Sequence, residues 1–143
     1  MPDLPALDAA AARVGDRWAL LLVAALLEGP RRFGELQGDL VGVAPNVLAK
    51  RLRTLEADGL VVATPYSRRP LRVAYGLTAA GTALAGALRL LAQWGAEHPG
   101  GARADRPEPL HHATCGTVVE ARWWCPTCER LVDPDDASDL RWA

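Results

Sequence analysis

The stretch "APNVLAKRLRTLEADGLVVATPYSRRPLRVAYGL" limits the choice of fold more than any other part of the chain. Pro45 is favourable in the first turn of a helix and Gly59 at its end, so the residues between them are predicted to form one helix. At 100° per residue, Leu48, Leu52 and Leu55 share one face, which predicts that this face is buried. The runs "LVVATPY" and "LRVAYGL", separated by the turn "SRRP", then predict a two-stranded hairpin.

Further helices are predicted on both sides of this unit. Residues 8–27 are rich in alanine and leucine, are followed by "GP", and contain "GD", which divides the helix into two pieces. Residues 33–40 predict a short helix with apolar residues at i, i+3 and i+7. After the hairpin, Thr78 caps one long helix over residues 79–97. The order helix, helix, helix, hairpin, helix predicts a mainly α, α+β fold of the winged helix-turn-helix type.

A segment rich in proline and glycine, "PGGARADRPEP", divides the chain. It predicts a linker over residues 99–109, between a domain of residues 1–98 and a small module of residues 110–143. The module has too few residues for an ordinary hydrophobic core.

Charge is distributed unevenly, although the formal net charge is only -1. Residues 45–72 contain six basic and two acidic residues, whereas the chain from residue 99 onward contains five basic and eight acidic ones. A basic middle favours a surface that binds a polyanion. The first residues lack the basic segment of a secretory signal, and the longest apolar run, "WALLLVAALL", is about half of a membrane span. A cytoplasmic protein without a membrane partner is therefore predicted.

The face of the 45–58 helix opposite the leucines carries the side chains that a helix needs in a major groove. Asn46, Lys50 and Arg53 are able to read base edges or to bind phosphates, and Ala49 permits close approach. Arg51 lies toward the flank of this face, where it meets either a phosphate or an acidic residue of its own domain.

The hairpin tip adds a second basic element, because its turn places two arginines on a stiff loop suited to phosphates or to the minor groove. The predicted recognition helix spans about residues 45–58, and the predicted wing spans about residues 66–72. The candidate DNA-binding residues are Asn46, Lys50, Arg51, Arg53, Arg68, Arg69 and Arg72. A basic helix face that is merely solvated is the alternative, and two basic elements in this order weigh against it.

Four motifs in this order resemble the HxlR-type winged helix regulators of bacteria: "GDRW", "RRFGEL", "NVLAKRL" with "LEADGLV", and the wing pattern "Y…P…VxYxLTxAG". The resemblance covers about residues 7–98. It implies a small dimeric DNA-binding regulator of transcription whose dimer binds paired half-sites, with helices 8–27 and 79–97 forming the dimer contact. The alternative is that both helices only close the core of the monomer.

In several members of that family, a cysteine in the DNA-binding domain is regarded as a sensor of electrophiles or oxidants. This chain departs from that pattern, because residues 1–114 contain no cysteine. Any thiol response must therefore come from the tail. The sequence names neither the operator nor an effector, whether a small molecule or an oxidant.

The tail contains two tetrapeptides with the same spacing, "HATC" and "CPTC", which we call the first and the second knuckle. Two ligand-x-x-ligand turns joined by a strand, here "VVEARWW", are typical of a zinc ribbon. The predicted ligands of one structural Zn²⁺ per chain are His112, Cys115, Cys125 and Cys128, with His111 as the alternative to His112. Zinc would also stabilise a tail that is too short for a core of its own.

Two other interpretations of the tail are weaker. The motif "WCPTC" resembles the active site of thioredoxin-like enzymes, but too few residues follow it for the βαβ domain that such chemistry requires. A metal-free disulfide in the second knuckle leaves Cys115 without a role. Strand alternation predicts that one of Trp123 and Trp124 points inward and the other outward.

The sequence thus predicts a sequence-specific transcription regulator that binds double-stranded DNA as a homodimer. An enzyme is not predicted, because no paired carboxylates, phosphate loop or activated nucleophile is recognisable. The alternatives are a winged helix module that binds protein, and a regulator that responds to thiol oxidation or to loss of zinc.

Overall fold

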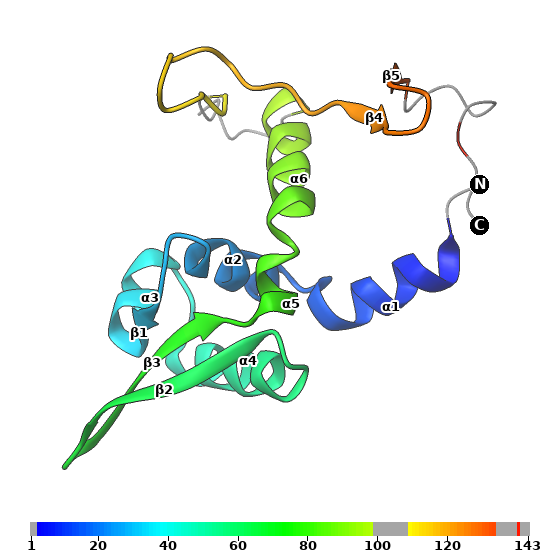
Figure 1. Cartoon of the computed structure of the whole chain (residues 1–143). Coiled ribbons are helices and arrows are strands. Elements are labelled where there is room, and N and C mark those ends of the chain that lie inside the picture. Colours follow the sequence, from blue (N-terminus) through cyan, green and yellow to red (C-terminus); the bar gives the residue numbers. More distant parts are fainter. Residues whose placement is uncertain (1–2, 99–108, 134–139, 141–143) are drawn as a thin grey trace. The chain divides into compact units, whose positions relative to one another are not determined.

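The structure is a computed structural model that describes residues 3–98, 109–133 and 140 (Figure 1). Two compact units can be distinguished, one of Asp8–Leu88 and the other of Met1–Leu7 together with Arg89–Ala143. The predicted linker lies outside the described residues except for residue 109, and the domain boundaries stay predictions. The helices and strands are α1 (Leu4–Val14), α2 (Arg17–Leu26), β1 (Arg31–Arg32), α3 (Phe33–Asp39), α4 (Pro45–Ala57), β2 (Val61–Arg68), β3 (Leu71–Leu77), α5 (Ala79–Thr82), α6 (Ala85–Glu97), β4 (Trp123–Cys125) and β5 (Arg130–Val132).

The core of the Asp8–Leu88 unit consists of aliphatic side chains from α2, α3, α4 and the start of β2. Leu48, Leu52 and Leu55 of α4 are at most 1% exposed, which confirms the predicted buried face. Each fully buried leucine stabilises the fold by roughly 1.5–3 kcal/mol relative to an exposed one. The other members of the core are Ala19, Leu22, Val23, Leu26, Leu36, Leu40, Val43, Leu60 and Val61.

The predicted interruption between the first two helices is confirmed, since α1 ends at Val14 and α2 begins at Arg17. A Cβ atom on Gly15 would lie only 2.5 Å from the carbonyl oxygen of Ala11, so this position has no room for a side chain. Asp16 then caps α2, because its carboxylate accepts hydrogen bonds from the backbone N–H groups of Trp18 and Ala19.

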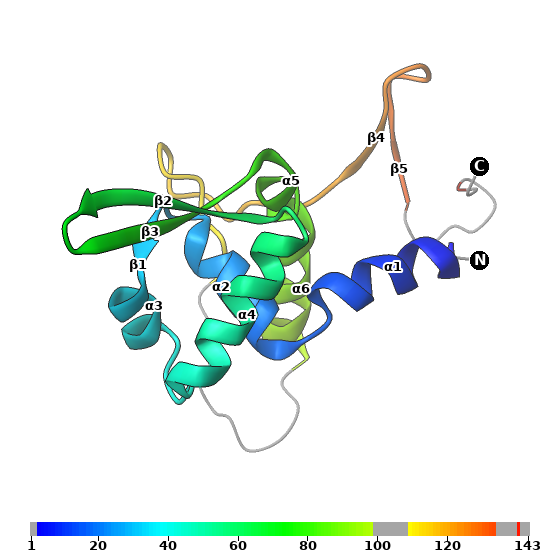
Figure 2. The ribbon, with the colours of Figure 1, turned by 90° about the horizontal axis from the view of Figure 1, so that it is seen from below.

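The hairpin of β2 and β3, which we call the wing, is antiparallel and extends beyond the helices (Figures 1 and 2). Its turn is tighter than predicted: Arg68 pairs with Leu71, and the Ser67 hydroxyl donates a hydrogen bond to the carbonyl oxygen of Pro70. A third strand, β1, pairs with β3 and gives the order β1-β3-β2. This strand of two residues was not predicted.

The prediction of one continuous helix over residues 79–97 is wrong, because α5 and α6 are separate. Thr78 caps α5 as predicted, by accepting a hydrogen bond from Gly81 N–H. One turn later the Thr82 hydroxyl bonds back to the Thr78 carbonyl, a contact that tends to bend helices. The Leu84 N–H donates to the carbonyl of Gly81, three residues earlier, which tightens the chain into a turn before α6 begins.

The tail has less regular structure than its sequence predicts. The expected strand over "VVEARWW" is realised only from Trp123, in β4, which pairs with β5. Val118 instead forms an isolated bridge with His111. Trp123 and Trp124 are 55% and 56% exposed, so the expectation that one of them points inward is wrong. The physical reason is that the tail offers no packed layer, since every residue from 109 to 124 is exposed.

Candidate nucleic-acid interface

Helix α4 presents its buried leucines to the core and its polar residues to solvent. Pro45 occupies the first turn as predicted, and α4 lies beside β2, so the helix and the wing belong to one surface of the Asp8–Leu88 unit (Figure 2). Asn46, Lys50 and Arg53 are exposed, while Ala49 between them is half-buried. The exposed face is therefore polar and basic and is supported from behind by three leucines.

Arg51, the remaining basic residue of α4, forms an ion pair within its own unit. Its Nε and Nη2 atoms lie 3.0 Å and 3.1 Å from the two carboxylate oxygens of Asp16. The interpretation of Arg51 as the partner of an acidic residue of its own domain is thus the one that the structure supports. Because Asp16 also caps α2, the pair ties the start of α2 to the middle of α4.

Replacing Asp16 with alanine should lower the free energy of unfolding by about 1–2 kcal/mol, since it removes both a helix cap and a half-exposed ion pair. Asp16→Asn keeps the cap and loses only the ion pair, so its effect should be smaller. Urea unfolding followed by far-UV circular dichroism measures both variants. An Asp16→Asn loss as large as that of Asp16→Ala would contradict the capping role.

The wing carries the other predicted cations. Arg68, Arg69 and Arg72 are all exposed, at or next to the turn between β2 and β3. A further cation, Arg32, was missed by the sequence reasoning. Its guanidinium carbon lies 4.6 Å from the centre of the Tyr66 ring, so β1 is braced against β2 across β3 by a cation–π contact.

This contact, two residues before the end of β2, holds the outer part of the wing against β1. It depends on pairing between Arg31–Arg32 and residues some forty positions later, Ala74 and Tyr75. Two residues are too few for a strand pattern to show, so only the tertiary structure reveals Arg32 as a residue that positions the wing.

Helices α1 and α6 carry apolar side chains that the chain itself does not cover. Both helices lie wholly within the described residues, and neither has a buried residue. Leu4 and Leu7 of α1 are exposed, and so are Leu90, Leu91 and Trp94 of α6. Among the described apolar residues of these helices, Val14 of α1 and Leu88 of α6 pack against the core, as does Leu84 just before α6. Of the helices predicted to form the dimer contact, α2 therefore closes the monomer core, whereas core packing does not account for α1 and α6.

The predicted metal ligands lie in two pairs. In the first knuckle, His112 Nδ1 is 3.2 Å from Cys115 Sγ. Hydrogen bonds from the side chain and backbone of Thr117, and from His112, lower the pKa of the Cys115 thiol to about 7. In the second knuckle, hydrogen bonds from Cys128 and from the Thr127 backbone lower the pKa of Cys125.

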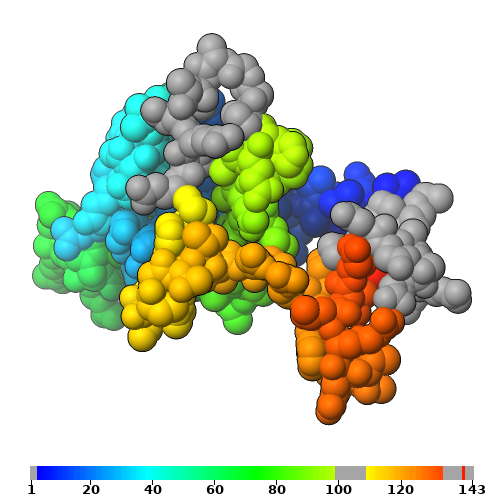
Figure 3. All heavy atoms as spheres, turned by 90° about the horizontal axis from the view of Figure 1, so that it is seen from above, coloured from blue at the N-terminus to red at the C-terminus, as the bar shows by residue number. Residues whose placement is uncertain are grey.

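The two pairs are not gathered at one point. Among residues 3–98, 109–133 and 140, no group of three or more His, Cys, Asp or Glu side chains is arranged to hold a metal ion. Figure 3 shows the knuckles as separate groups of atoms, yellow and orange, joined by a narrow segment. All three cysteines are free thiols.

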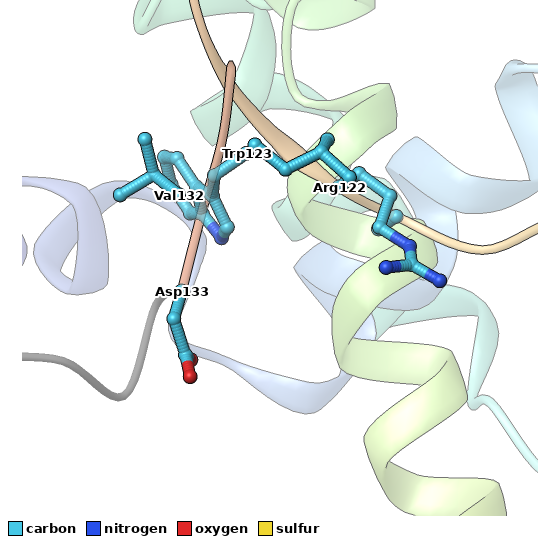
Figure 4. A pocket seen from close by; sticks show the side chains of 6 residues that line it. Arg122, Trp123, Val132 and Asp133 are labelled. Atoms are coloured by element: carbon cyan, nitrogen blue, oxygen red, sulfur yellow. The ribbon is translucent and has the colours of Figure 1, made fainter.

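A shallow pocket of about 410 Å³ lies on the β4–β5 hairpin. Trp123 and Val132, which are direct cross-strand partners, line it together with Arg122 and Asp133 (Figure 4). None of the candidate DNA-binding residues or metal ligands contributes to it. Within the part of the chain that is described, no helix has the length and apolar character needed to cross a membrane.

Comparison with known proteins identifies relatives of the winged helix region. The profile of the family described as HxlR-like helix-turn-helix matches residues 13–101. The uncharacterised HTH-type transcriptional regulator Rv3095 of Mycobacterium tuberculosis is 42% identical over 119 residues, which are 80% of this chain and 72% of that protein.

Solved structures show the same fold. The reduced form of the redox regulator HypR is 28% identical and has a TM-score of 0.61, with 64% of this chain and 90% of that chain covered. The crystal structure of PA1607, a candidate transcription factor, is 32% identical and has a TM-score of 0.76, with 93% and 89% covered. A match over 93% of this chain extends well past the winged helix, so the tail also has a counterpart in PA1607.

Proposed function

Because this chain belongs to the HxlR-like helix-turn-helix family, whose relatives are HTH-type transcriptional regulators, we propose that it is a sequence-specific regulator that binds double-stranded DNA as a homodimer. The observation that carries the proposal is the exposed face of α4, with Asn46, Lys50 and Arg53 on a helix held rigidly by buried leucines. No enzymatic activity is proposed.

In this proposal α4 enters the major groove. Asn46 lies in the first turn, where a recognition helix contacts base edges, and its amide is suited to the N6 and N7 atoms of adenine. Lys50 and Arg53 lie one and two turns further along, where they contact phosphates or guanine. Ala49 lets the backbone approach the bases.

The wing follows the duplex beside the groove. Arg68 and Arg69 at its tip, with Arg72 just behind, are placed to bind phosphates or to enter the minor groove. Arg32 holds the wing in position through Tyr66. Arg51 remains in its ion pair with Asp16 and contributes by fixing α4.

The exposed apolar residues of α1 and α6 form the homodimer contact in this proposal. Trp94, 60% exposed, and its neighbours Leu90 and Leu91 are the kind of side chains that dominate obligate interfaces. A dimer would place two α4 helices on successive half-sites of one duplex. In this proposal the regulator acts in the cytoplasm, where its DNA lies.

The expected result is a complex whose affinity depends steeply on salt. A duplex selected from a random-sequence pool should be bound by a particle of about twice the chain mass of 15.3 kDa. With six to eight phosphate contacts per dimer, the affinity should fall about 10³- to 10⁴-fold between 50 and 200 mM salt. Fluorescence anisotropy and light scattering measure the two quantities. A dimer that selects no duplex would support the alternative of a module that binds protein.

A regulator that responds to thiol oxidation is a second candidate. HypR, a solved relative, is described as a redox regulator. In this chain such a response would fall on the three free cysteines of the tail, since the Asp8–Leu88 unit contains none. Anisotropy with and without a thiol oxidant, on the same duplex, separates this candidate from a regulator with an inert tail.

A further inference from the structure

The tail contains two turns that are built alike, although their sequences differ. In the first knuckle, His112 and Cys115 are followed by Gly116 at φ 71°. In the second, Cys125 and Cys128 are followed by Glu129 at φ 50°. A positive φ is unfavourable for glutamate, so its presence at the same offset indicates that the geometry of the turn is required.

Each turn is also closed by pairing of the backbone on its two sides. In the first knuckle, Gly116 N–H donates to the carbonyl of His112, and His112 N–H donates to the carbonyl of Thr117, both at 2.8 Å. In the second knuckle, Cys125 pairs with Arg130 in the ladder between β4 and β5. Both ligand pairs are therefore held at the end of a short two-stranded ribbon.

We propose that His112, Cys115, Cys125 and Cys128 bind one Zn²⁺ per chain, and that the ion joins the two separately formed knuckles into one folded unit. One imidazole and three thiolates are the donor set that zinc prefers in structural sites, and they are unsuited to Mg²⁺ or Ca²⁺. The proposal is independent of DNA binding, because it concerns the tail alone.

The first knuckle indicates which histidine and which atom take part. Tetrahedral zinc with bonds of about 2.1 and 2.3 Å separates a nitrogen and a sulfur ligand by roughly 3.5 Å. His112 Nδ1 and Cys115 Sγ are 3.2 Å apart, so a small adjustment admits the ion between them. His111 belongs instead to the ribbon below the turn, where its backbone bridges Val118.

Neither knuckle can form a closed zinc site alone, because such a site needs four ligands and each knuckle supplies two. Bringing the pairs together requires the segment between them to bend, and the ion provides the free energy for this step. The same movement would gather apolar side chains that are now exposed on the tail, namely Val118, Val119, Trp123, Trp124 and Leu131.

Titration of the reduced, metal-free full chain with Co²⁺ tests the proposal without reference to DNA. Tetrahedral cobalt–thiolate bands should appear and saturate at one equivalent, and one equivalent of Zn²⁺ should abolish them. His112→Ala should weaken Zn²⁺ binding by about 100-fold or more, since four ligands share the whole binding free energy. The matched variant His111→Ala should bind as the unmodified chain does.

Several outcomes would overturn the proposal. These are the absence of cobalt–thiolate bands, saturation at half an equivalent, and a loss on His111→Ala that exceeds the loss on His112→Ala. A quantitative Cys125–Cys128 disulfide that forms equally fast with and without Zn²⁺ would also do so. Thermal unfolding of the Asp8–Leu88 unit serves as the control for global misfolding, because the variants should leave it unchanged.

Discussion

Replacing Lys50 and Arg53 together with alanine is expected to weaken binding to a selected duplex by about 1,000-fold or more, because the homodimer loses four interactions with the duplex and each loss costs roughly 1–3 kcal/mol. Both side chains are exposed on the face of α4 opposite the buried leucines, so the fold should not change. If both side chains bind phosphates, the slope of log K against log salt should also become shallower, by about 0.9 for each phosphate that is no longer neutralised. Anisotropy at several salt concentrations gives both quantities.

The control for this experiment removes two cations elsewhere. Arg103→Ala with Arg106→Ala has the same effect on net charge, and both residues lie in the predicted linker, outside α4, the wing and the proposed dimer contact. This double variant should bind within about twofold of the unmodified chain, as expected for a uniform change in charge alone. If both double variants weakened binding equally, the role of α4 as the recognition helix would be contradicted.

The parts of the fold that the sequence predicted are those in which the signal is local. The leucines at 48, 52 and 55 mark a buried helix face by their spacing alone, and "GD" at residues 15 and 16 marks a helix break by its steric and capping properties. The wing was predicted because two β-rich runs flank a turn that contains proline. In each case a few neighbouring residues carry the information.

The parts that were missed depend on contacts between distant residues. Strand β1 exists because Arg31–Arg32 pairs with β3, and a two-residue strand has no periodicity. The break between α5 and α6 falls in a run with high helix propensity, where back-bonding by Thr82 and the packing of Leu84 and Leu88 override that propensity. In the tail, the strand predicted over "VVEARWW" forms only at its end, because no packed layer lies against it to stabilise the rest.

In the candidate site, too, local sequence patterns predicted some features, and contacts between distant residues determined the rest. Six of the seven predicted DNA-binding side chains are exposed, on α4 and the wing, as their positions in the sequence implied. For Arg51 the sequence left two partners open, and the choice depended on Asp16, a residue 35 positions away. Helix geometry placed Arg51 on the flank of α4, but it did not identify the acid opposite.

Gly81→Ala is expected to cause the largest loss of stability, about 3 kcal/mol, at the junction of the wing with the helices. A Cβ atom on Gly81 would lie 2.2 Å from the carbonyl oxygen of Leu60 and 3.0 Å from Leu77 Cδ2. The Leu60 carbonyl cannot move away freely, because it accepts a hydrogen bond from Thr78 N–H. Overpacking of this kind costs about 1–3 kcal/mol or more, which corresponds to a melting temperature lower by roughly 10 °C.

Substitution of a second glycine provides the control, because it is expected to raise the free energy of unfolding. Gly34 lies in α3, and a Cβ atom there would meet nothing within 4 Å. Gly34→Ala should therefore raise the free energy of unfolding by about 0.5–1 kcal/mol, through helix propensity alone. Both variants are compared by thermal and urea unfolding at one protein concentration, since a dimer's stability depends on concentration. If Gly81→Ala were as stable as Gly34→Ala, close contact with Leu60 would not be the reason for glycine in the "LTAAG" motif.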